Sequence, residues 1–199
     1  PSSYINEHGI KVTRLPYLLN NMVGFKLKSF AGLQEALDSA SPNMLFIHGC
    51  QFINISTIVR YLKKHSNVIT YIDNHADFSN SATNWISKNI LHKIIWRHYA
   101  QSINPFVKKW YGVLPARVDF LKNVYGLPAD KIEFLPMGAD DNLVEKYSLP
   151  EVRLKYRKKY GIAEDDLLIV TGGKIDLAKK QILLLMDAVN QIDNSKLKL

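Results

Sequence analysis

The sequence is poor in cysteine, in carboxylates and in long apolar runs. Cys50 is the single cysteine among 199 residues, so an intramolecular disulfide framework is excluded and a reducing compartment is expected. No apolar run approaches the ~20 residues that a membrane-spanning helix needs. These absences favour a protein whose fold depends on an ordinary hydrophobic core.

The shortage of carboxylates leaves the chain basic. Asp and Glu number 18 against 26 Lys and Arg, which gives a formal net charge of +8 and a pI near 9.4. Such a balance favours anionic partners: phosphates, nucleic acid or an acidic lipid surface. Hydrophobic residues make up 47% and charged residues 22%, a globular composition that excludes a disordered chain.

Apolar runs alternate with segments of helical periodicity along the whole chain. The apolar runs read as buried strands and the periodic segments as amphipathic helices. This alternation predicts an α/β fold: a Rossmann-like parallel sheet with helices on both faces, followed by a partial second α/β unit. The expected strands are residues 9–17, 44–47, 68–72, 113–114, 132–135 and 167–171. The expected helices are residues 33–40, 55–65, 85–103, 117–125, 151–160 and 181–192.

The composition changes after Asp140, where a polar stretch is followed by a strongly basic helix at 151–160. We therefore expect a first domain over residues 1–143. Residues 144–199 would form a linker and the beginning of a second domain.

Polar residues follow three of the expected strands. They are His48 with Gly49, the Asp73–Asp77 segment that contains His75, and residues 171–174. Ligands of parallel sheets bind beyond the carboxyl ends of the strands, so His48, Gly49 and His75 are candidate site residues. The alternating Asp73, His75 and Asp77 could hold a metal, but a solvated loop explains them as well, and we expect no metal.

A glycine turn with lysines follows the last long apolar run. Residues 167–171 lead into Gly172 and Gly173, and Lys174, Lys179 and Lys180 come before the helix at 181–192. Glycine backbone, a helix N-terminus and ammonium groups together suit a phosphate. The alternative is an ordinary strand-to-helix turn with solvated lysines.

Several segments, in order, resemble the family-4 glycosyltransferases of the GT-B fold. The segment 124–140 (VYGLPADKIEFLPMGAD) resembles the family's approach to the turn that closes its N-terminal domain, with Met137 where Asn is usual. The segment 170–180 (VTGGKIDLAKK) resembles the first strand and loop of its donor domain. The resemblance implies an internal fragment that covers most of the acceptor domain and the start of the donor domain, and that is inactive by itself.

The resemblance also implies roles for individual residues. His75 would be the active-site histidine beside the donor sugar, and His48 with Gly49 would line the acceptor side. Gly173, Lys174 and either Lys179 or Lys180 would bind the donor diphosphate of a UDP-, GDP- or ADP-sugar. No cofactor is implied.

The expected helix at 85–103 carries two kinds of surface. At a helical period of 3.6, an apolar face would be core, and Trp85 and Trp96 would share the opposite side. Residues of that core face are Ile86, Ile90, Leu91, Ile94 and Ile95, and residues flanking the tryptophans are Lys88, His92 and Lys93. Tryptophan beside cations suits a helix resting on anionic lipid; packing against a neighbouring loop is the alternative.

The sequence and the resemblance together predict a glycosyltransferase. It would move a sugar, with retention, from a nucleotide-diphosphate sugar to a glycan or lipid-linked saccharide in cell-surface polysaccharide synthesis. The setting would be cytoplasmic, with peripheral attachment to the inner membrane face. Alternatives are a sugar-nucleotide epimerase of the same fold and a basic nucleic-acid-binding module. The second would need lysines and aromatics clustered on one surface, and because the basic residues are spread over several helices we expect no nucleic-acid partner.

Overall fold

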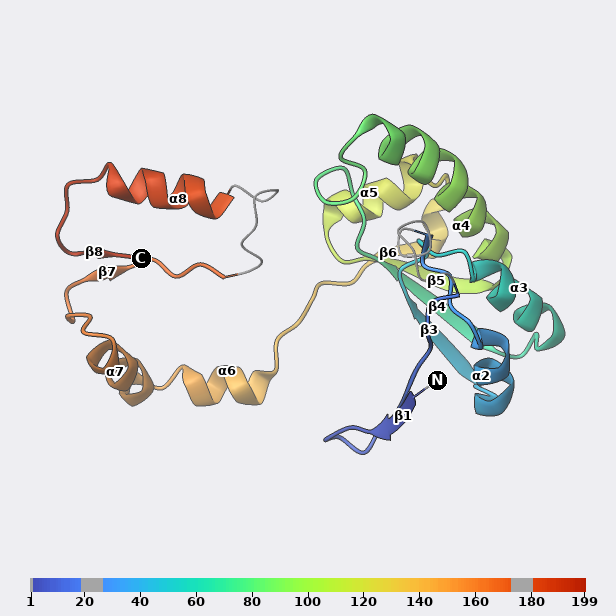
Figure 1. The fold of residues 1–199 in the computed structure, drawn as a ribbon, viewed down its shortest axis with the longest axis horizontal. Helices are drawn as coiled ribbons and strands as arrows, with labels where there is room; N and C mark the ends of the chain where they lie inside the picture. The colour runs from blue at the N-terminus through green and yellow to red at the C-terminus, as the bar shows by residue number, and fades with distance from the viewer. Residues whose placement is uncertain (1, 19–26, 173–180) are drawn as a thin grey trace. The chain divides into compact units, whose positions relative to one another are not determined.

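The computed structural model describes residues 2–18, 27–172 and 181–199. The chain divides into two compact units, Pro1–Met137 and Gly138–Leu199. Each unit is described by itself below (Figure 1). The boundary expected from sequence, between residues 143 and 144, falls within the helix α6, Asp141–Tyr147.

The first unit is built on a parallel sheet of four strands in the order β3-β4-β5-β6. The strands are β3 (Met44–His48), β4 (Ile69–Asn74), β5 (Val107–Gly112) and β6 (Ile132–Phe134). Because the strands are parallel and consecutive, their carboxyl ends lie along one edge. This arrangement confirms the expected Rossmann-like α/β class, a parallel sheet flanked by helices. The sequence predicted helices on both faces, whereas the crossovers described next lie on one face.

Helical crossovers connect the strands. They are α3 (Ile55–Lys64), the π-helix η1 (Ser87–Trp96) continued by α4 (Arg97–Ile103) and the short 3-10 helix η2 (Asn104–Phe106), and α5 (Pro115–Asn123) followed by the 3-10 helix η3 (Ala129–Lys131). Right-handed crossovers between strands in consecutive order all fall on the same face of a sheet. The burial of the strands agrees, since Ile72 and Trp110 are fully buried while their neighbours Tyr71 and Tyr111 are only half-buried. A further helix, α2 (Leu33–Ala40), packs against α3.

The core lies between the sheet and these crossovers. Its largest fully buried side chains are Trp110, Tyr61, Tyr125, Phe120, Ile55 and Leu62. Burying an apolar side chain of this size contributes roughly 1.5–3 kcal/mol. Trp110 also satisfies its indole N–H, which donates to Oδ1 of Asn104 at 3.0 Å.

Three of the expected strands differ from the structure. The strand expected at 167–171 is reduced to Leu167–Leu168. Residues 9–17 contribute only one arm of an antiparallel hairpin, in which β1 (Ser2–Ile5) pairs with β2 (Lys11–Arg14). The expectation of a strand at 113–114 is wrong, since β5 ends at Gly112. Lys108 and Lys109 interrupt the apolar pattern of β5, so the sequence pattern does not reveal this strand. The ammonium of Lys109 pairs with Glu133 on β6.

The helix at 85–103 exists as expected, but the expectation of its buried face is wrong in part: of the five residues expected in the core, Leu91 and Ile95 do pack against it. Its first part is a π-helix, in which the N–H of Arg97 donates to the carbonyl of His92, five residues earlier. The wider turn changes the period, so residues four or five apart share a face. His92 and Trp96 are buried. Three isoleucines expected in the core, Ile86, Ile90 and Ile94, are exposed.

The second unit begins with two helices, α6 and α7 (Pro150–Lys159). The carboxylate of Asp140 accepts the backbone N–H of Leu143 at 3.1 Å and caps α6, which sequence analysis missed. A short parallel pair follows, β7 (Leu167–Leu168) with β8 (Leu197–Lys198), and α8 (Gln181–Asn190) lies between them in sequence. After α6, the order of elements in this unit is helix, strand, helix, strand.

One buried arginine organises this unit. The guanidinium of Arg157 on α7 donates to the carbonyls of Ala163, Glu164 and Asp166. These bonds fix the loop that leads from α7 into β7. Because all of these acceptors are backbone carbonyls of the neighbouring loop, we assign Arg157 a structural role and no ligand.

Candidate functional site

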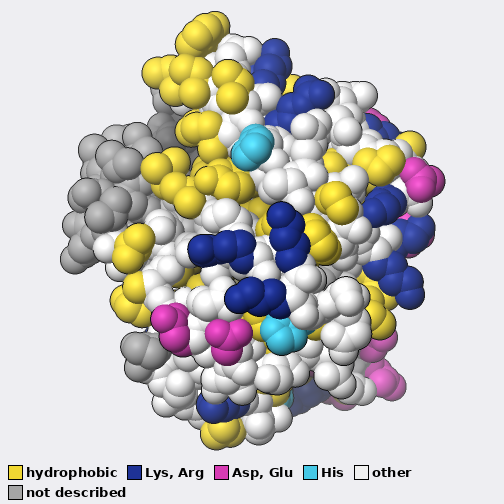
Figure 2. All heavy atoms as spheres, turned by 90° about the vertical axis from the view of Figure 1, so that its right-hand side faces the viewer, with side chains coloured by type: hydrophobic (Ala, Val, Ile, Leu, Met, Phe, Trp, Pro, Cys, Tyr) yellow, Lys and Arg dark blue, Asp and Glu magenta, His cyan; other side chains and the backbone are white. Residues whose placement is uncertain are grey.

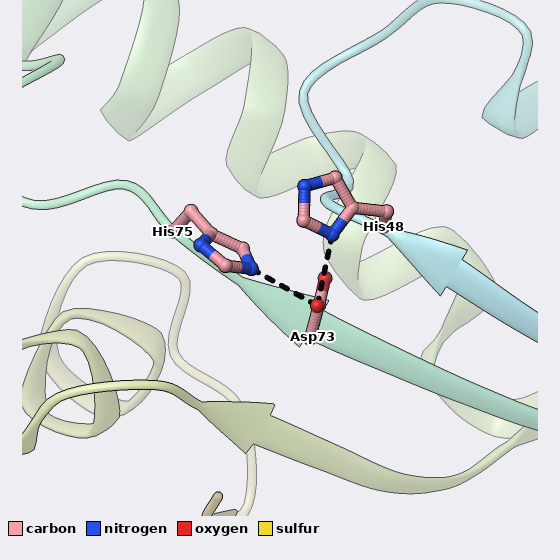
Figure 3. Close-up of side chains that lie close together, drawn as sticks. All are labelled: His48, Asp73 and His75. Carbon is pink, nitrogen blue, oxygen red and sulfur yellow. Dashed lines mark hydrogen bonds and ion pairs between the residues drawn. The ribbon is translucent and has the colours of Figure 1, made fainter. Parts of the chain in front are cut away.

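Three side chains converge at the carboxyl edge of the first unit's sheet. His48 ends β3, Asp73 lies near the end of β4, and His75 follows β4 directly (Figure 3). Nδ1 of His48 lies 2.9 Å from Oδ2 of Asp73, and Nε2 of His75 lies 3.0 Å from the same oxygen. The two imidazole rings are 4.3 Å apart between centroids.

The pairing of β3 with β4 produces this convergence. In the parallel register His48 stands beside Asp73, so their side chains leave the sheet on the same face. Gly49 then turns the chain with a φ of +80°, a value that L side chains rarely adopt. Its N–H donates to Oδ1 of Asp73 at 3.0 Å. Both oxygens of the Asp73 carboxylate therefore accept from residues at the end of β3: Oδ2 from His48 and Oδ1 from Gly49.

The three side chains differ in burial: Asp73 lies at the bottom of the site and the two histidines lie nearer its surface. The side chain of Asp73 is 8% exposed, that of His75 31% and that of His48 74%. An ionised carboxylate can only accept, so each imidazole donates its N–H to Asp73. Nε2 of His48 and Nδ1 of His75 make no hydrogen bond within the described residues, and in these tautomers both are acceptors. The site thus offers two imidazole acceptors, one of them well exposed, fixed by one buried charge.

A buried polar chain lies on the helix side of the same edge. The amide of Gln51 donates to Oδ1 of Asn74 at 3.0 Å and to the hydroxyl of Tyr125 at 2.9 Å. The Tyr125 hydroxyl lies 2.9 Å from Nδ1 of His92, and Nε2 of His92 lies 2.9 Å from Oγ of Ser81. Burial lowers the pKa of His92 to about 4 and raises that of the Tyr125 hydroxyl. Both groups are therefore neutral at pH 7, and the chain acts as a rigid support behind β4.

Asp77 does not join the cluster. Its Oδ2 accepts from Nε of Arg117 at 3.1 Å, and its Oδ1 accepts from the backbone N–H of Ser79 at 2.7 Å. Burial opposes ionisation here, but the bonds from Ser79 and Arg117 hold the pKa of Asp77 below its ordinary value. The grouping of Asp73, His75 and Asp77 that the sequence suggested is replaced by one in which His48 takes the third place.

The same cluster is the group to consider for a metal. One ligand atom from each of His48, Asp73 and His75 lies within 4.8 Å of the others. Two imidazoles and a carboxylate are a ligand set that suits zinc and other first-row metals. The observed hydrogen bonds satisfy the carboxylate without an ion, however, and the expectation that this protein uses no metal stays a prediction.

The expected donor-phosphate residues cannot be placed. Gly173, Lys174, Lys179 and Lys180 lie outside the described residues. Of the sequence-predicted site, the structure therefore brings together His48, Gly49 and His75.

Several residues of the site escaped the sequence analysis. Asp73 was considered only as a metal ligand, whereas it anchors both histidines. His92 was expected at the surface and is 1% exposed. Gln51 and Tyr125 carried no signal, because a lone glutamine and an aromatic residue at a helix end are common in any chain. The position of Asp73 in β4 was a usable signal, since charge within an otherwise apolar strand is costly unless it is paired.

Comparison with known proteins supports the fold. No protein-family model matches the sequence, and no curated protein matches it. Among solved structures, a glycosyltransferase from Rickettsia africae ESF-5 aligns with a TM-score of 0.51 at 14% sequence identity. The alignment covers 89% of this chain and 43% of that one, so this chain spans less than half the length of that protein. At such low identity the likeness shows the fold alone: this is a glycosyltransferase-like α/β fold. Among the described residues, no helix is both long and apolar enough to cross a bilayer.

Proposed function

We propose that this protein is a glycosyltransferase that moves a sugar from a nucleotide-diphosphate sugar to a hydroxyl group. The observation that carries the proposal is the His48–Asp73–His75 cluster at the carboxyl edge of the parallel sheet, where ligands of such sheets bind. The glycosyltransferase-like fold supports it.

The chemistry of the cluster suits a sugar. With their N–H groups directed to Asp73, the imidazoles present Nε2 of His48 and Nδ1 of His75 as acceptors. Sugar hydroxyls are donors, and two acceptors on rings 4.3 Å apart suit neighbouring hydroxyls of one ring. His75, the less exposed of the two, would orient the donor sugar, and His48 would meet the acceptor. Held geometry of this kind lowers the barrier by placing the reacting groups before reaction.

The donor half of the proposal rests on the sequence. Gly173, Lys174 and Lys179 or Lys180 would bind the diphosphate of a UDP-, GDP- or ADP-sugar. Their charges would neutralise the leaving diphosphate as the glycosidic bond breaks. Membership of family 4, the GT-B architecture and retention of configuration belong to this proposal and rest on the resemblance of residues 124–140 and 170–180.

We place the reaction in cell-surface polysaccharide synthesis at the cytoplasmic face of the membrane, with a glycan or lipid-linked saccharide as acceptor. The support is the family resemblance and the basic character of the chain, whose net charge is +8. The proposal requires no cofactor beyond the donor.

Titration calorimetry tests the function. UDP-glucose, GDP-mannose and ADP-glucose are titrated into the full chain, and one of them should bind. His75→Ala should weaken that binding about tenfold, the loss of one well-placed hydrogen bond to the ligand. The matched control is His98→Ala, because His98 lies on α4 away from the cluster and contacts Tyr99. Failure of all three donors to bind, or an equal effect of both substitutions, would refute the proposal. NMR of the bound donor distinguishes the epimerase, which would change the sugar without an acceptor.

Lys174→Ala and Lys180→Ala test the donor site separately. Each should weaken binding of the nucleotide sugar and of the free nucleoside diphosphate alike, since both ligands carry the diphosphate. Unchanged binding in both variants would remove the phosphate assignment while leaving the histidine cluster in place.

A further inference from the structure

The helix η1 carries an apolar surface that the fold leaves uncovered. Four side chains on or just before this helix, called here the η1 stripe, are Trp85, Ile86, Ile90 and Ile94. Their exposed fractions are 70%, 60%, 39% and 62%. Trp85 immediately precedes Ile86, the N-cap residue of η1. Side chains of this size are usually buried in monomeric proteins, and several together on one surface indicate an interaction site.

The orientation of η1 is fixed, so the stripe cannot turn inward. On its inner side His92 is bonded to the Tyr125 hydroxyl and to Oγ of Ser81, both at 2.9 Å. Ser87 donates to the carbonyl of Ser81, and Trp96 is 4% exposed. Rotating the helix to bury the stripe would break these buried bonds and expose Trp96. A π-helix is rare and is frequently found at functional sites.

The chain segment that carries the stripe contains cations and no carboxylate. Residues 78–118 contain six Lys and Arg and no Asp or Glu. Three of these cations, Lys88, Lys93 and Arg97, are exposed on η1 and α4, and no carboxylate of the described residues pairs with them. Lys93 donates to Oδ1 of Asn89 at 3.0 Å, and Lys88 lies 4.8 Å from the centre of the Phe78 ring. In Figure 2, hydrophobic side chains gather beside Lys and Arg side chains at the top of the view, the end of the first unit where η1 lies in Figure 1.

We propose that the η1 stripe rests on the surface of an anionic lipid bilayer. Isoleucines would enter the boundary between headgroups and acyl chains, Trp85 would lie at the interface, and Lys88, Lys93 and Arg97 would meet lipid phosphates. The combination of exposed isoleucines with neighbouring cations favours an anionic bilayer over nucleic acid or a protein partner. Single-stranded nucleic acid is bound by several aromatic side chains on which successive bases stack, and of the four stripe side chains only Trp85 is aromatic. A protein partner matched to this surface would have to be both apolar and uniformly acidic, whereas an anionic bilayer has both properties everywhere.

The proposal also places the candidate site close to the membrane, because a short segment of chain and a hydrogen bond connect the site to η1. The segment from His75 to Trp85 leads directly from the carboxyl edge of β4 into η1. Ser81 within this segment is bonded to His92, which ties the segment to the helix. A saccharide linked to a lipid of the same bilayer could therefore approach the edge that carries His48 and His75. This last step rests on the proposed function; the membrane contact itself does not.

Tryptophan fluorescence tests the contact directly. The chain has three tryptophans, of which Trp96 and Trp110 are 4% and 0% exposed and Trp85 is 70% exposed. Adding vesicles of phosphatidylcholine with 30% phosphatidylglycerol to the full chain should therefore shift the emission of Trp85 alone to the blue. Pure phosphatidylcholine vesicles should produce a much smaller shift. Trp85→Phe should abolish the shift without loss of vesicle co-sedimentation beyond a few-fold.

Charge and apolar variants supply matched controls. Lys88→Gln with Lys93→Gln should lower the vesicle partition coefficient roughly 30-fold, from about 1 kcal/mol for each cation at an anionic surface. Lys155→Gln with Lys158→Gln removes the same charge from exposed positions of α7 and should change it less than threefold. Ile86→Ser with Ile94→Ser should also abolish binding, whereas Leu154→Ser, at a side chain 55% exposed on α7, should not.

Three outcomes would overturn the proposal. They are no blue shift with anionic vesicles, equal loss of binding in the η1 and α7 lysine pairs, and binding that survives the isoleucine substitutions. The second would mean that only net charge attracts the protein to lipid. None of these outcomes bears on nucleotide-sugar binding, so the failure of this proposal and that of the proposed function are distinguishable.

Discussion

Replacing Asp73 by asparagine should invert the hydrogen-bonding character of the candidate site. In the native protein the carboxylate accepts from His48, from His75 and from the N–H of Gly49. An asparagine has one oxygen, which the Gly49 N–H would hold in the place of Oδ1. Its NH2 group would then face both imidazoles and donate to them. Each ring would move its proton to the outer nitrogen, so the two acceptors offered to a ligand would become two donors.

The effect on stability follows from the burial of each bond. A hydrogen bond to a charged group contributes roughly 1.5–3 kcal/mol, against about 1 kcal/mol for a neutral one. The bond to His48 counts for little, because that side chain is 74% exposed and solvent screens it. Weakening the two remaining bonds by about 1 kcal/mol each predicts a decrease of about 2 kcal/mol in the free energy of unfolding.

Two measurements check this prediction. Long-range proton–nitrogen NMR correlations identify the protonated nitrogen of each imidazole, which should be Nδ1 in His48 and Nε2 in His75 of the native protein, and the opposite nitrogens in Asp73→Asn. His98 is an internal reference, since it lies outside the cluster. Urea unfolding gives the stability change. Unaltered tautomers in the variant would refute the reasoning, because Asp73 would then not set the polarity of the site.

Three further predictions concern the core. Because burial lowers the pKa of His92 to about 4 from 6.5, unfolding becomes easier by about 3 kcal/mol as the pH falls from 6.5 to 4, and His92→Gln should remove this slope from pH-dependent urea midpoints. Gly112→Ala should destabilise by about 3 kcal/mol, since a Cβ would lie 2.5 Å from the backbone N of Val118; Gly172→Ala, in open space, should be neutral in the same assay. Burial raises the pKa of Cys50 to about 12, so iodoacetamide at pH 8 should label it only after unfolding; rapid labelling of the native chain would contradict its burial.

Local patterns in the sequence determined most of the fold. The alternation of apolar runs and amphipathic segments specifies a parallel sheet flanked by helices, because each strand of such a sheet is followed by a helix that crosses over to the next strand. The helix Leu33–Ala40 begins and ends where the sequence predicts it. Strand ends were also legible from sequence, which is why His48, Gly49 and His75 could be named as candidates before their positions were known.

Tertiary structure alone decided what those residues do together. That His48 and His75 share one oxygen of Asp73 follows from the register between β3 and β4, and register is set by packing across the whole sheet, which no local pattern records. The face that η1 buries was likewise decided by tertiary bonds. A period of 3.6 residues places Ile86 and Ile94 inside, but the bonds of His92 to Tyr125 and Ser81 and the burial of Trp96 favour a wider helical turn that places both isoleucines outside. Sequence periodicity assumes a regular helix, and here the buried polar bonds determine the helix geometry.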